Sequence, residues 1–439
     1  MIEIRCFSSI DALKPFRDEI NALNLGSYRP DPFSTLEFHE HYVQHDQMLL
    51  DDTGVRPCFL VAMKEGSLVG YLPLKQTSHR VFGIRTTKVT FLSVHDVDQP
   101  HLLARAECAQ AVVEALYKYL YERHIKWGLL EFHQQASDSL LVRYSPKTIP
   151  RGYHVHYWAS WSNWTIPIRW EHLEGYFKDL SKKCRSNVSR QMRSLYAAGV
   201  LEFIGSSDPE ATPALLNLYL AIEPHSWKSK AGLNIGRDPL RIRYFRGLLA
   251  AEQPMRISIL LLMLNGVPIA GLINGEYGKG LYALQVIYDD RLNDMSPGSA
   301  ILLMGIREAI TGRYEAFNLL SGFDYFKNRW LAEATETRST QIYRRSSPLF
   351  WRRSAGDQIR RILGRFKKSP SMKSNPIRKE AMEPKEQSMG AAPVSKTAIT
   401  AEEQSRISSL LSEARRGECQ MLSAEELAAA MPFGMTRPL

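Results

Sequence analysis

The chain has few cysteines and no long apolar run, and both shortages limit where it works. Residues 1–20 lack the basic start and apolar core of a signal peptide. The most apolar window, residues 257–274, is interrupted by Asn265-Gly266 and predicts a β-hairpin rather than a membrane span. The spacing of the cysteines forms neither a disulfide framework nor a metal motif. We therefore expect a cytoplasmic protein that holds no metal. The five cysteines are Cys6, Cys58, Cys108, Cys184 and Cys419.

A recognisable catalytic signature is missing as well, because the order of residues suggests neither a Ser-His-Asp triad nor a metal cluster. The length of 439 residues allows two domains and a tail. The net charge of +10 is unevenly spread. Residues 1–160 carry 17 Lys and Arg against 18 Asp and Glu, residues 161–350 carry 23 against 18, and residues 351–439 carry 16 against 10. The basic second half suits an anionic ligand, RNA or an anionic lipid surface.

The most informative stretch runs from residue 281 to residue 330. Leu281–Tyr288 is rich in aromatic and β-branched residues and predicts a strand. Ser296 then occupies a predicted helix N-cap, with Pro297 at the first helical position. The apolar periodicity of that helix ends at Gly312, and residues 314–320 predict a second strand. Strand, helix and strand in this order predict a βαβ unit.

The first turn of the predicted helix carries almost no side-chain bulk. Its unpaired N–H groups and the positive end of the helix dipole make it a place for a phosphate or pyrophosphate. An ordinary well-capped helix is the alternative interpretation. The residues concerned are Ser296, Pro297, Gly298, Ser299 and Ala300.

These residues carry a resemblance to a known superfamily. The segment Met295–Ala300 resembles the Q/R-x-x-G-x-G/A loop with which GNAT acyltransferases hold the pyrophosphate of acyl-CoA, although Met295 replaces the Gln or Arg. Ser296-Pro297-Gly298, the later segment Gly322–Lys327 and the Trp-Lys segment Glu223–Lys228 together resemble the CelD-like acetyltransferases of cellulose and exopolysaccharide biosynthesis. The resemblance covers roughly residues 1 to 345. It implies acetyl-CoA or another acyl-CoA as co-substrate.

The resemblance also implies an α/β fold with mixed sheets, in which two GNAT-like domains follow each other. We assign residues 1–160 to a degenerate first domain, because the stretch comparable to the phosphate turn, Val94–Pro100, has two carboxylates and no glycine. A first domain unrelated to the second is the alternative. Residues 161–348 form the acyltransferase domain, in which residues 341–344 are expected as a final strand. A basic amphipathic helix follows at 349–368, and a largely disordered tail with two short helices, near 402–416 and 424–431, occupies 369–439.

The resemblance places the chemistry on a splayed strand, Tyr282–Tyr288, whose backbone near Ile287 and Tyr288 positions the thioester. Among side chains, Asp324 is our first candidate for a base or acceptor-binding group. Tyr325 is the candidate proton donor to the leaving sulfur, and Lys327 is expected to bind a phosphate or an acceptor carboxylate. Glu223, with Lys228 nearby, is the rival base. The alternative for each is a surface or salt-bridged residue.

Two basic segments invite a second interpretation. Lys182, Arg185, Ser189 and Arg193 are spaced to share one helix face, which predicts either a solvated surface or a contact with the CoA phosphates or an anionic acceptor. The amphipathic helix at 349–368 predicts either binding to an anionic membrane surface or docking on the domain. We expect a cytoplasmic location, with peripheral contact at the inner face of the membrane.

The leading hypothesis is an acyl-CoA-dependent N- or O-acetyltransferase that acts on a sugar, polysaccharide or cell-envelope precursor. One alternative is a Fem-type aminoacyltransferase, which would hold aminoacyl-tRNA through the basic segments. The other is a non-catalytic GNAT-like scaffold at the membrane-bound polysaccharide machinery, which the replacement by Met295 keeps open. The sequence favours neither a metal nor, outside the tRNA alternative, a nucleic acid.

Overall fold

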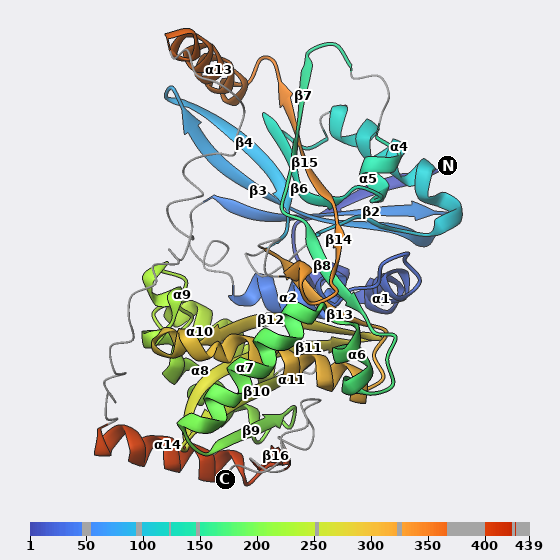
Figure 1. Ribbon diagram of the computed structural model, residues 1–439. Helices are drawn as coiled ribbons and strands as arrows, with labels where there is room; N and C mark the ends of the chain where they lie inside the picture. The colour runs from blue at the N-terminus through green and yellow to red at the C-terminus, as the bar shows by residue number, and fades with distance from the viewer. Residues whose placement is uncertain are drawn as a thin grey trace.

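A computed structural model describes residues 1–45, 54–93, 99–122, 124–145, 150–250, 254–322, 327–366, 400–423 and 426. The chain folds into two eight-stranded sheets that lie one above the other in Figure 1, each covered by helices. Both sheets mix parallel and antiparallel pairs. The predicted α/β class with mixed sheets is therefore confirmed.

The first sheet has the strand order β1-β2-β3-β4-β6-β15-β7, with β5 beside β3. Its β4 and β6 are parallel and are joined through helix α4, so this domain contains a βαβ unit of its own. Its strands are β1 (Glu3–Phe7), β2 (Val55–Lys64), β3 (Ser67–Val81), β4 (Ile84–Phe91), β5 (Leu103–Ala104), β6 (Leu129–Ala136), β7 (Tyr153–Ala159) and β15 (Thr337–Arg344). Its helices are η1 (Asp11–Phe16), α1 (Arg17–Leu25), η2 (Pro32–Ser34), α2 (Leu36–His45), η3 (Ala106–Cys108), α4 (Ala109–Tyr121) and α5 (Leu140–Arg143).

The second sheet has the order β14-β8-β13-β12-β11-β10-β9-β16. The hairpin predicted around Asn265-Gly266 is confirmed as β10–β11. The strands are β8 (Asn163–Pro167), β9 (Leu201–Ser206), β10 (Arg256–Leu264), β11 (Val267–Tyr277), β12 (Gly280–Tyr288), β13 (Ala316–Ser321), β14 (Glu333–Thr335) and β16 (Gln420–Leu422). The helices are α6 (Leu173–Asp179), α7 (Lys182–Ala198), α8 (Thr212–Ile222), η4 (Glu223–His225), α9 (Trp227–Lys230), α10 (Pro239–Ala250), η5 (Asp290–Met295), α11 (Pro297–Thr311) and α14 (Ala401–Ala414).

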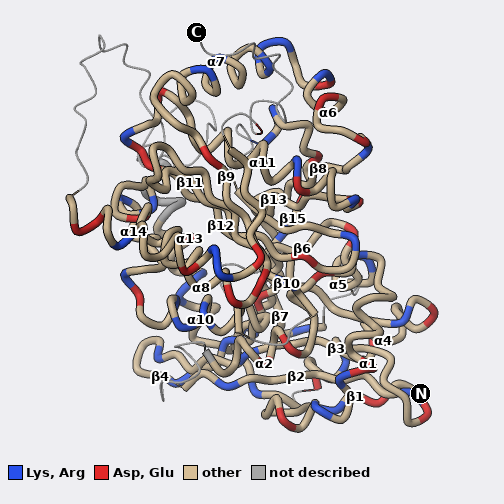
Figure 2. The backbone as a smooth tube through the Cα atoms, turned by 90° about the horizontal axis from the view of Figure 1, so that it is seen from below, with Lys and Arg blue, Asp and Glu red and all other residues tan. Residues whose placement is uncertain are grey.

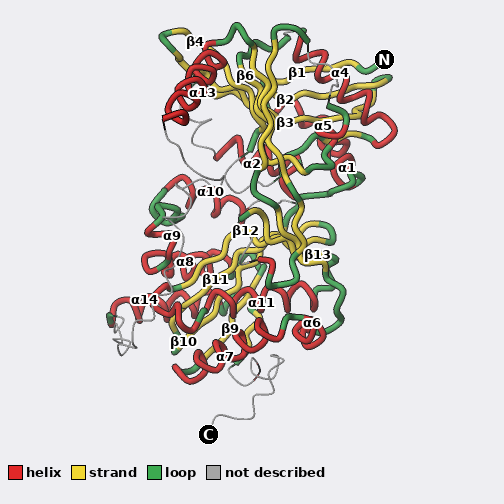
Figure 3. Tube along the Cα trace, turned by 45° about the horizontal axis from the view of Figure 1, so that its top comes forward, coloured by secondary structure: helices red, strands yellow, loops and turns green. Residues whose placement is uncertain are grey.

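Helices cover both faces of the second sheet, as Figure 3 shows. One core lies between the sheet and helices α6, α7 and α11, and includes the buried Tyr176, Met192 and Ile306. The other core lies against α8 and α10 and includes Tyr219 and Phe245. Burial of apolar side chains on both faces explains why β10 and β11 read as nearly continuous apolar runs.

The first domain reaches into this second core. Phe33 of η2 packs edge-on against Tyr282 of β12, with ring centroids 5.9 Å apart. The Tyr282 hydroxyl donates to the carbonyl of Pro30 over 3.1 Å. Asn24 donates to the Tyr277 hydroxyl over 2.9 Å. The segment between α1 and α2 therefore fixes the first domain against β11 and β12, next to the predicted splayed strand.

Two boundaries differ from the sequence expectation. Strand β15, which contains the expected final strand of the second domain, pairs instead with β6 and β7 of the first sheet. The chain thus returns to the first domain after β14, since the apolar Ile342 completes the first core. Residues 341–344 therefore do not close the second domain. Helix α13 (Pro348–Phe366) follows β15 on the first domain.

The end of the chain is more ordered than expected. Helix α14 packs on α8 through the buried Ile407 and Ala414, and β16 pairs with β9. Figure 1 shows this element at the bottom of the second domain. A capping box between Thr400 and Glu403 starts α14. The expected disorder of residues 369–399 and the helix near 424–431 fall outside the described residues, apart from Glu426.

Among the described residues, no helix is both long and apolar enough to cross a membrane. The same residues contain no cluster of His, Cys, Asp and Glu side chains that could hold a metal ion.

Candidate functional site

Strands β12 and β13 start as a parallel pair and then separate. Their register pairs Gly280 with Ala316, Leu281 with Phe317 and Tyr282 with Asn318. Beyond Tyr282, β12 stays paired with β11 as far as Tyr288, whereas β13 follows β8 through an irregular register. The described residues of the two strands therefore open a wedge. This confirms the splay expected at Tyr282–Tyr288.

A β-bulge lies in the middle of the wedge strand. Ile273 of β11 faces Gln285, but the next residue, Asn274, faces Ala283, so Leu284 is the extra residue on β12. Bulges re-aim side chains and often lie beside active sites. Asn274 is fully buried beside the bulge, and neither its amide oxygen nor its amide nitrogen has a hydrogen-bond partner. A buried amide without partners is costly, so Asn274 is a polar group beside the bulge that the fold itself does not satisfy.

Helix α11 begins at the end of η5 after β12, as the sequence predicts. Ser296 precedes it in the left-handed conformation, with φ 50° and ψ 58°. Its hydroxyl does not cap the helix, contrary to the expected N-cap, and lies instead 3.0 Å from the hydroxyl of Ser299. The Ser296 carbonyl accepts from the Ser299 N–H over 2.9 Å. Pro297 occupies the first helical position without an N–H to satisfy.

Gly298 fits closely against Tyr288, the last residue of β12. A Cβ atom at position 298 would lie 2.7 Å from the ring of Tyr288, closer than carbon atoms pack. The absence of a side chain at 298 therefore lets the helix start lie directly on the wedge strand. Ser299 and Ala300 are buried in the same turn, while Ile287 is buried on the opposite face in the second core.

An exposed cation that the sequence interpretation missed lies at this helix start. The guanidinium of Arg329 donates to the Ser299 hydroxyl over 3.4 Å. It comes from the segment after β13, close to Trp330, whose ring centroid is 5.8 Å from Arg329 Cζ. Met295, which replaces the basic or amide residue of the family loop, packs against the apolar core instead. In the sequence, the only feature that could have indicated Arg329 was its position as a basic residue shortly after the second strand of the βαβ unit.

Lys327 is held by the backbone. Its ammonium donates to the carbonyls of Leu319, Leu320 and Ser321 over 2.6, 2.8 and 2.7 Å. These contacts tie the Lys327 side chain to the end of β13 at the wedge. Its expected contact with a phosphate or an acceptor carboxylate stays a prediction. The neighbouring candidates Asp324 and Tyr325 lie outside the described residues.

Glu223 and Lys228 are both buried, but they do different things. The Glu223 carboxylate accepts the N–H groups of Ile235 and Gly236 over 2.8 and 2.6 Å, and so anchors the loop after α9. The Lys228 ammonium donates to the side-chain oxygen of Gln285 on the bulged strand. Of the two residues, only Lys228 reaches the wedge strand.

The basic helix α7 has one buried face, formed by Cys184, Val188, Met192 and Leu195, and its basic residues lie outside that face. Figure 2 shows the basic segments along α7. Arg185 is engaged locally, since its guanidinium donates to the carbonyls of Lys178 and Leu180 at the end of α6. Lys182 and Arg193 are exposed, whereas Ser189 is half-buried. The four residues therefore do not form one uniform exposed face.

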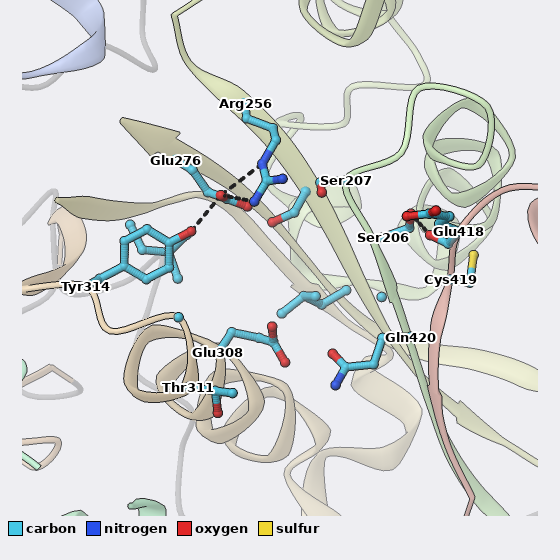
Figure 4. A pocket seen from close by; sticks show the side chains of 15 residues that line it. Ser206, Ser207, Arg256, Glu276, Glu308, Thr311, Tyr314, Glu418, Cys419 and Gln420 are labelled. Carbon is cyan, nitrogen blue, oxygen red and sulfur yellow. Dashed lines mark hydrogen bonds and ion pairs between the residues drawn. The ribbon is translucent and has the colours of Figure 1, made fainter. Parts of the chain in front are cut away.

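A cavity of about 610 Å³ lies at the opposite end of α11. Figure 4 shows that Arg256 and Tyr314 both reach Glu276 there, at 2.6 Å each, while Glu308 of α11 projects into the same space. Burial raises the pKa of Glu308, and burial together with the Glu276 carboxylate raises the pKa of Tyr314 to about 12. Because carboxylates and the negative helix end repel phosphate, this cavity does not suit an acyl-CoA pyrophosphate.

Comparison with known proteins agrees with the wedge. Residues 182–328 match the family described as "Acetyltransferase (GNAT) domain". A search of curated proteins finds no match. Similar solved structures include a conserved protein of unknown function from Bacteroides thetaiotaomicron VPI-5482, with 10% identity over 78% of this chain and 100% of that chain, at a TM-score of 0.47.

Two further structures are FemX, with 11% identity over 74% of this chain and 95% of that chain at a TM-score of 0.39, and a tandem GNAT protein from the clavulanic acid biosynthesis pathway, with 9% identity over 79% and 99% at 0.36. No function is transferred from likenesses this distant. Residues 182–328 are thus similar to a GNAT acetyltransferase domain, and this part of the chain includes the wedge and the start of α11.

Proposed function

We propose that this protein transfers an acyl group from acyl-CoA to an amine or hydroxyl acceptor, and that the wedge between β12 and β13 is the place of transfer. The observation that carries the proposal is the separation of the two parallel strands after Tyr282, with the start of α11 next to it on Tyr288.

The donor end of this site suits a pyrophosphate. The first-turn N–H groups of α11 and its dipole favour an anion, and Gly298 leaves no side chain in the way. Arg329 adds a positive charge beside Ser299. In our proposal Arg329 takes over the charge that Met295 does not supply, since a guanidinium pairs well with phosphate oxygens.

The acceptor end lies on the other face, where α9 approaches the bulge. Attack of the acceptor on the thioester carbonyl forms the new C–N or C–O bond and places negative charge on the carbonyl oxygen. The C–S bond then breaks and the thiolate leaves. The buried Lys228 ammonium, held at Gln285, is the group that we propose for stabilising that charge. Asp324 stays our candidate base, with Tyr325 as proton donor to sulfur.

The acceptor class is a sugar, polysaccharide or cell-envelope precursor, and acetyl-CoA is the proposed donor. Support for both comes from the CelD-like resemblance of Ser296-Pro297-Gly298 and Glu223–Lys228.

Calorimetric titration of acetyl-CoA into the full chain tests the donor site. Gly298→Ala would push the ring of Tyr288 or the start of α11, so we expect at least about tenfold weaker binding. Gly175→Ala in α6 is the matched control, because its Cβ would stand 3.4 Å from Trp170, an ordinary contact. A folded wild-type chain that binds no acyl-CoA would refute the proposal, as would equal binding by the two variants.

A further inference from the structure

Four large apolar side chains are exposed at one end of the first domain. Phe82 and Ile84 stand at the turn between β3 and β4, with 70% and 59% of their surfaces exposed. Trp351 and Ile359 of α13 are 64% and 56% exposed. Figures 1 and 3 both show the tip of this hairpin beside α13. We call these residues the apolar end.

Helix α13 turns one face to the protein and one away from it. Its inner face includes the buried Leu349 and the half-buried Phe350 and Arg353. Trp351, Ala355 and Ile359 are spaced four residues apart and are all exposed, so they line up on the outer face. The outer face is therefore an apolar stripe that the described part of the protein does not cover.

Contacts on the inner face fix this orientation. The Arg353 guanidinium donates to the Gln341 side-chain oxygen over 3.4 Å and lies 5.6 Å above the Tyr343 ring. The Trp351 indole N–H donates to the Arg345 carbonyl over 2.8 Å, which leaves the rest of the ring outward. The helix is thus docked on the domain at its start, as one of the two interpretations of the sequence expected. Its outer side carries apolar residues.

The sequence around the apolar end is rich in basic residues. Residues 348–368 contain seven Lys and Arg and a single acidic residue, Asp357, and Arg80 and Arg85 flank the hairpin tip. Arg352 lies close enough to the hairpin for its charge to help lower the pKa of His79, after the larger effect of burial. Asp357 is turned to the inner Arg353, 3.6 Å away. Positive charge around exposed aromatic and aliphatic groups is the pattern of surfaces that enter the headgroup region of anionic bilayers.

We propose that the β3–β4 hairpin tip and the outer face of α13 together bind an anionic lipid bilayer, with the side chains of the apolar end inserted among the headgroups. Two separate elements supply the insertion, so the surface is wider than the helix alone. The favoured partner is a lipid surface because the apolar groups project from a convex tip and a helix side, and because the charge complements anionic headgroups. This proposal does not depend on acyl transfer.

Co-sedimentation of the full chain with vesicles tests it. We expect binding to vesicles of phosphatidylcholine with phosphatidylglycerol, weak binding to phosphatidylcholine alone, and weaker binding in high salt. Phe82→Ser combined with Ile359→Ser should weaken binding to the anionic vesicles at least about tenfold. Leu25→Ser combined with Leu233→Ser removes the same number of exposed apolar side chains elsewhere and should change nothing.

The proposal would be overturned if folded wild-type protein did not bind anionic vesicles, or if the control variant lost as much vesicle binding as the Phe82→Ser, Ile359→Ser variant. It would also be overturned if light scattering showed a wild-type dimer that the Phe82→Ser, Ile359→Ser variant converts to a monomer. The last result would assign the surface to contact between copies of this chain. Acetyl-CoA titration of the same variants should give wild-type affinity. A failure of the lipid-binding proposal can therefore be told apart from a failure of the proposed acyl-CoA site.

Discussion

Lys228 of α9 donates a hydrogen bond to the side chain of Gln285 on β12, and this contact places a buried ammonium group at the bulged wall of the wedge. The two residues come from elements separated by α10 and the β10–β11 hairpin. A buried ammonium is costly unless it is paired or hydrogen-bonded, and the bond to Gln285 supplies such a partner here. In our proposal the positive charge stabilises the negative charge that develops during transfer.

Replacing Lys228 by Met should keep the volume of the side chain and remove its charge. We expect turnover to fall by about 100-fold while acetyl-CoA affinity stays near the wild-type value, because the ammonium acts on charge that develops only during reaction. Steady-state kinetics and calorimetry check the two expectations separately. Lys230→Met is the matched control, since Lys230 is exposed and pairs with Asp290. A variant at 228 with normal turnover would remove this residue from the mechanism.

Replacing Arg329 by Gln should weaken the binding of acetyl-CoA rather than slow the chemical step. The guanidinium beside Ser299 is exposed, so we expect a folded protein with roughly tenfold weaker acetyl-CoA binding. The loss should shrink at high ionic strength, because salt screens the attraction to phosphate. Arg246→Gln on α10 provides a basic-to-neutral control on the other side of the sheet. Equal affinity of the two variants would show that the phosphate lies elsewhere.

The Lys327→Met variant distinguishes a holding role from a binding role. Loss of three hydrogen bonds to the carbonyls that end β13 should lower the free energy of unfolding by about 2–4 kcal/mol. Urea unfolding measures this, with Lys279→Met, an exposed residue paired with Glu315, as the control. If Lys327→Met loses activity at unchanged stability, the binding role expected from the sequence is the better one.

Acidification should weaken the first domain through two buried histidines. Burial lowers the pKa of His133 to about 4 and that of His39 to about 3. Near pH 6.5 the unfolded chain therefore binds protons that the folded chain does not bind. The contribution of these histidines to the free energy of unfolding is full above that pH and falls as the pH drops toward 4. Each histidine contributes at most about 1.4 kcal/mol per pH unit.

Urea midpoints at pH 7 and pH 5 measure the effect. His133→Gln should reduce the difference between the two midpoints, whereas His124→Gln, at an exposed position, should leave it unchanged. An unaltered difference in the His133 variant would mean that other groups govern the acid sensitivity.

Local features of the fold could be predicted because their causes are local. Turn residues at Asn265-Gly266 determine the β10–β11 hairpin, and Pro297 followed by small residues marks the start of α11. The same segment carried the family resemblance, and the family match over residues 182–328 confirms its GNAT part. The donor site at this segment stays a prediction.

Which side chains serve the site was decided by tertiary contacts. The sequence cannot show that Lys327 folds back on three carbonyls, that Arg329 reaches Ser299, or that Lys228 meets Gln285, because each contact depends on how separate strands and helices diverge in space. The return of β15 to the first sheet is likewise a long-range contact that the sequence cannot show. Its pairing with β6 joins residues about 200 positions apart in the printed sequence, and no local pattern selects one sheet over the other.

The sequence by itself determined the βαβ unit, the small residues at the start of its helix and the amphipathic character of α13, since propensity, capping and periodicity act over a few residues. The tertiary structure alone decided the domain boundaries, the polar partners within the wedge and the outward direction of Trp351. The physical reason is that burial and strand pairing are properties of the assembled chain, in which a side chain's environment is set by residues far away in the sequence.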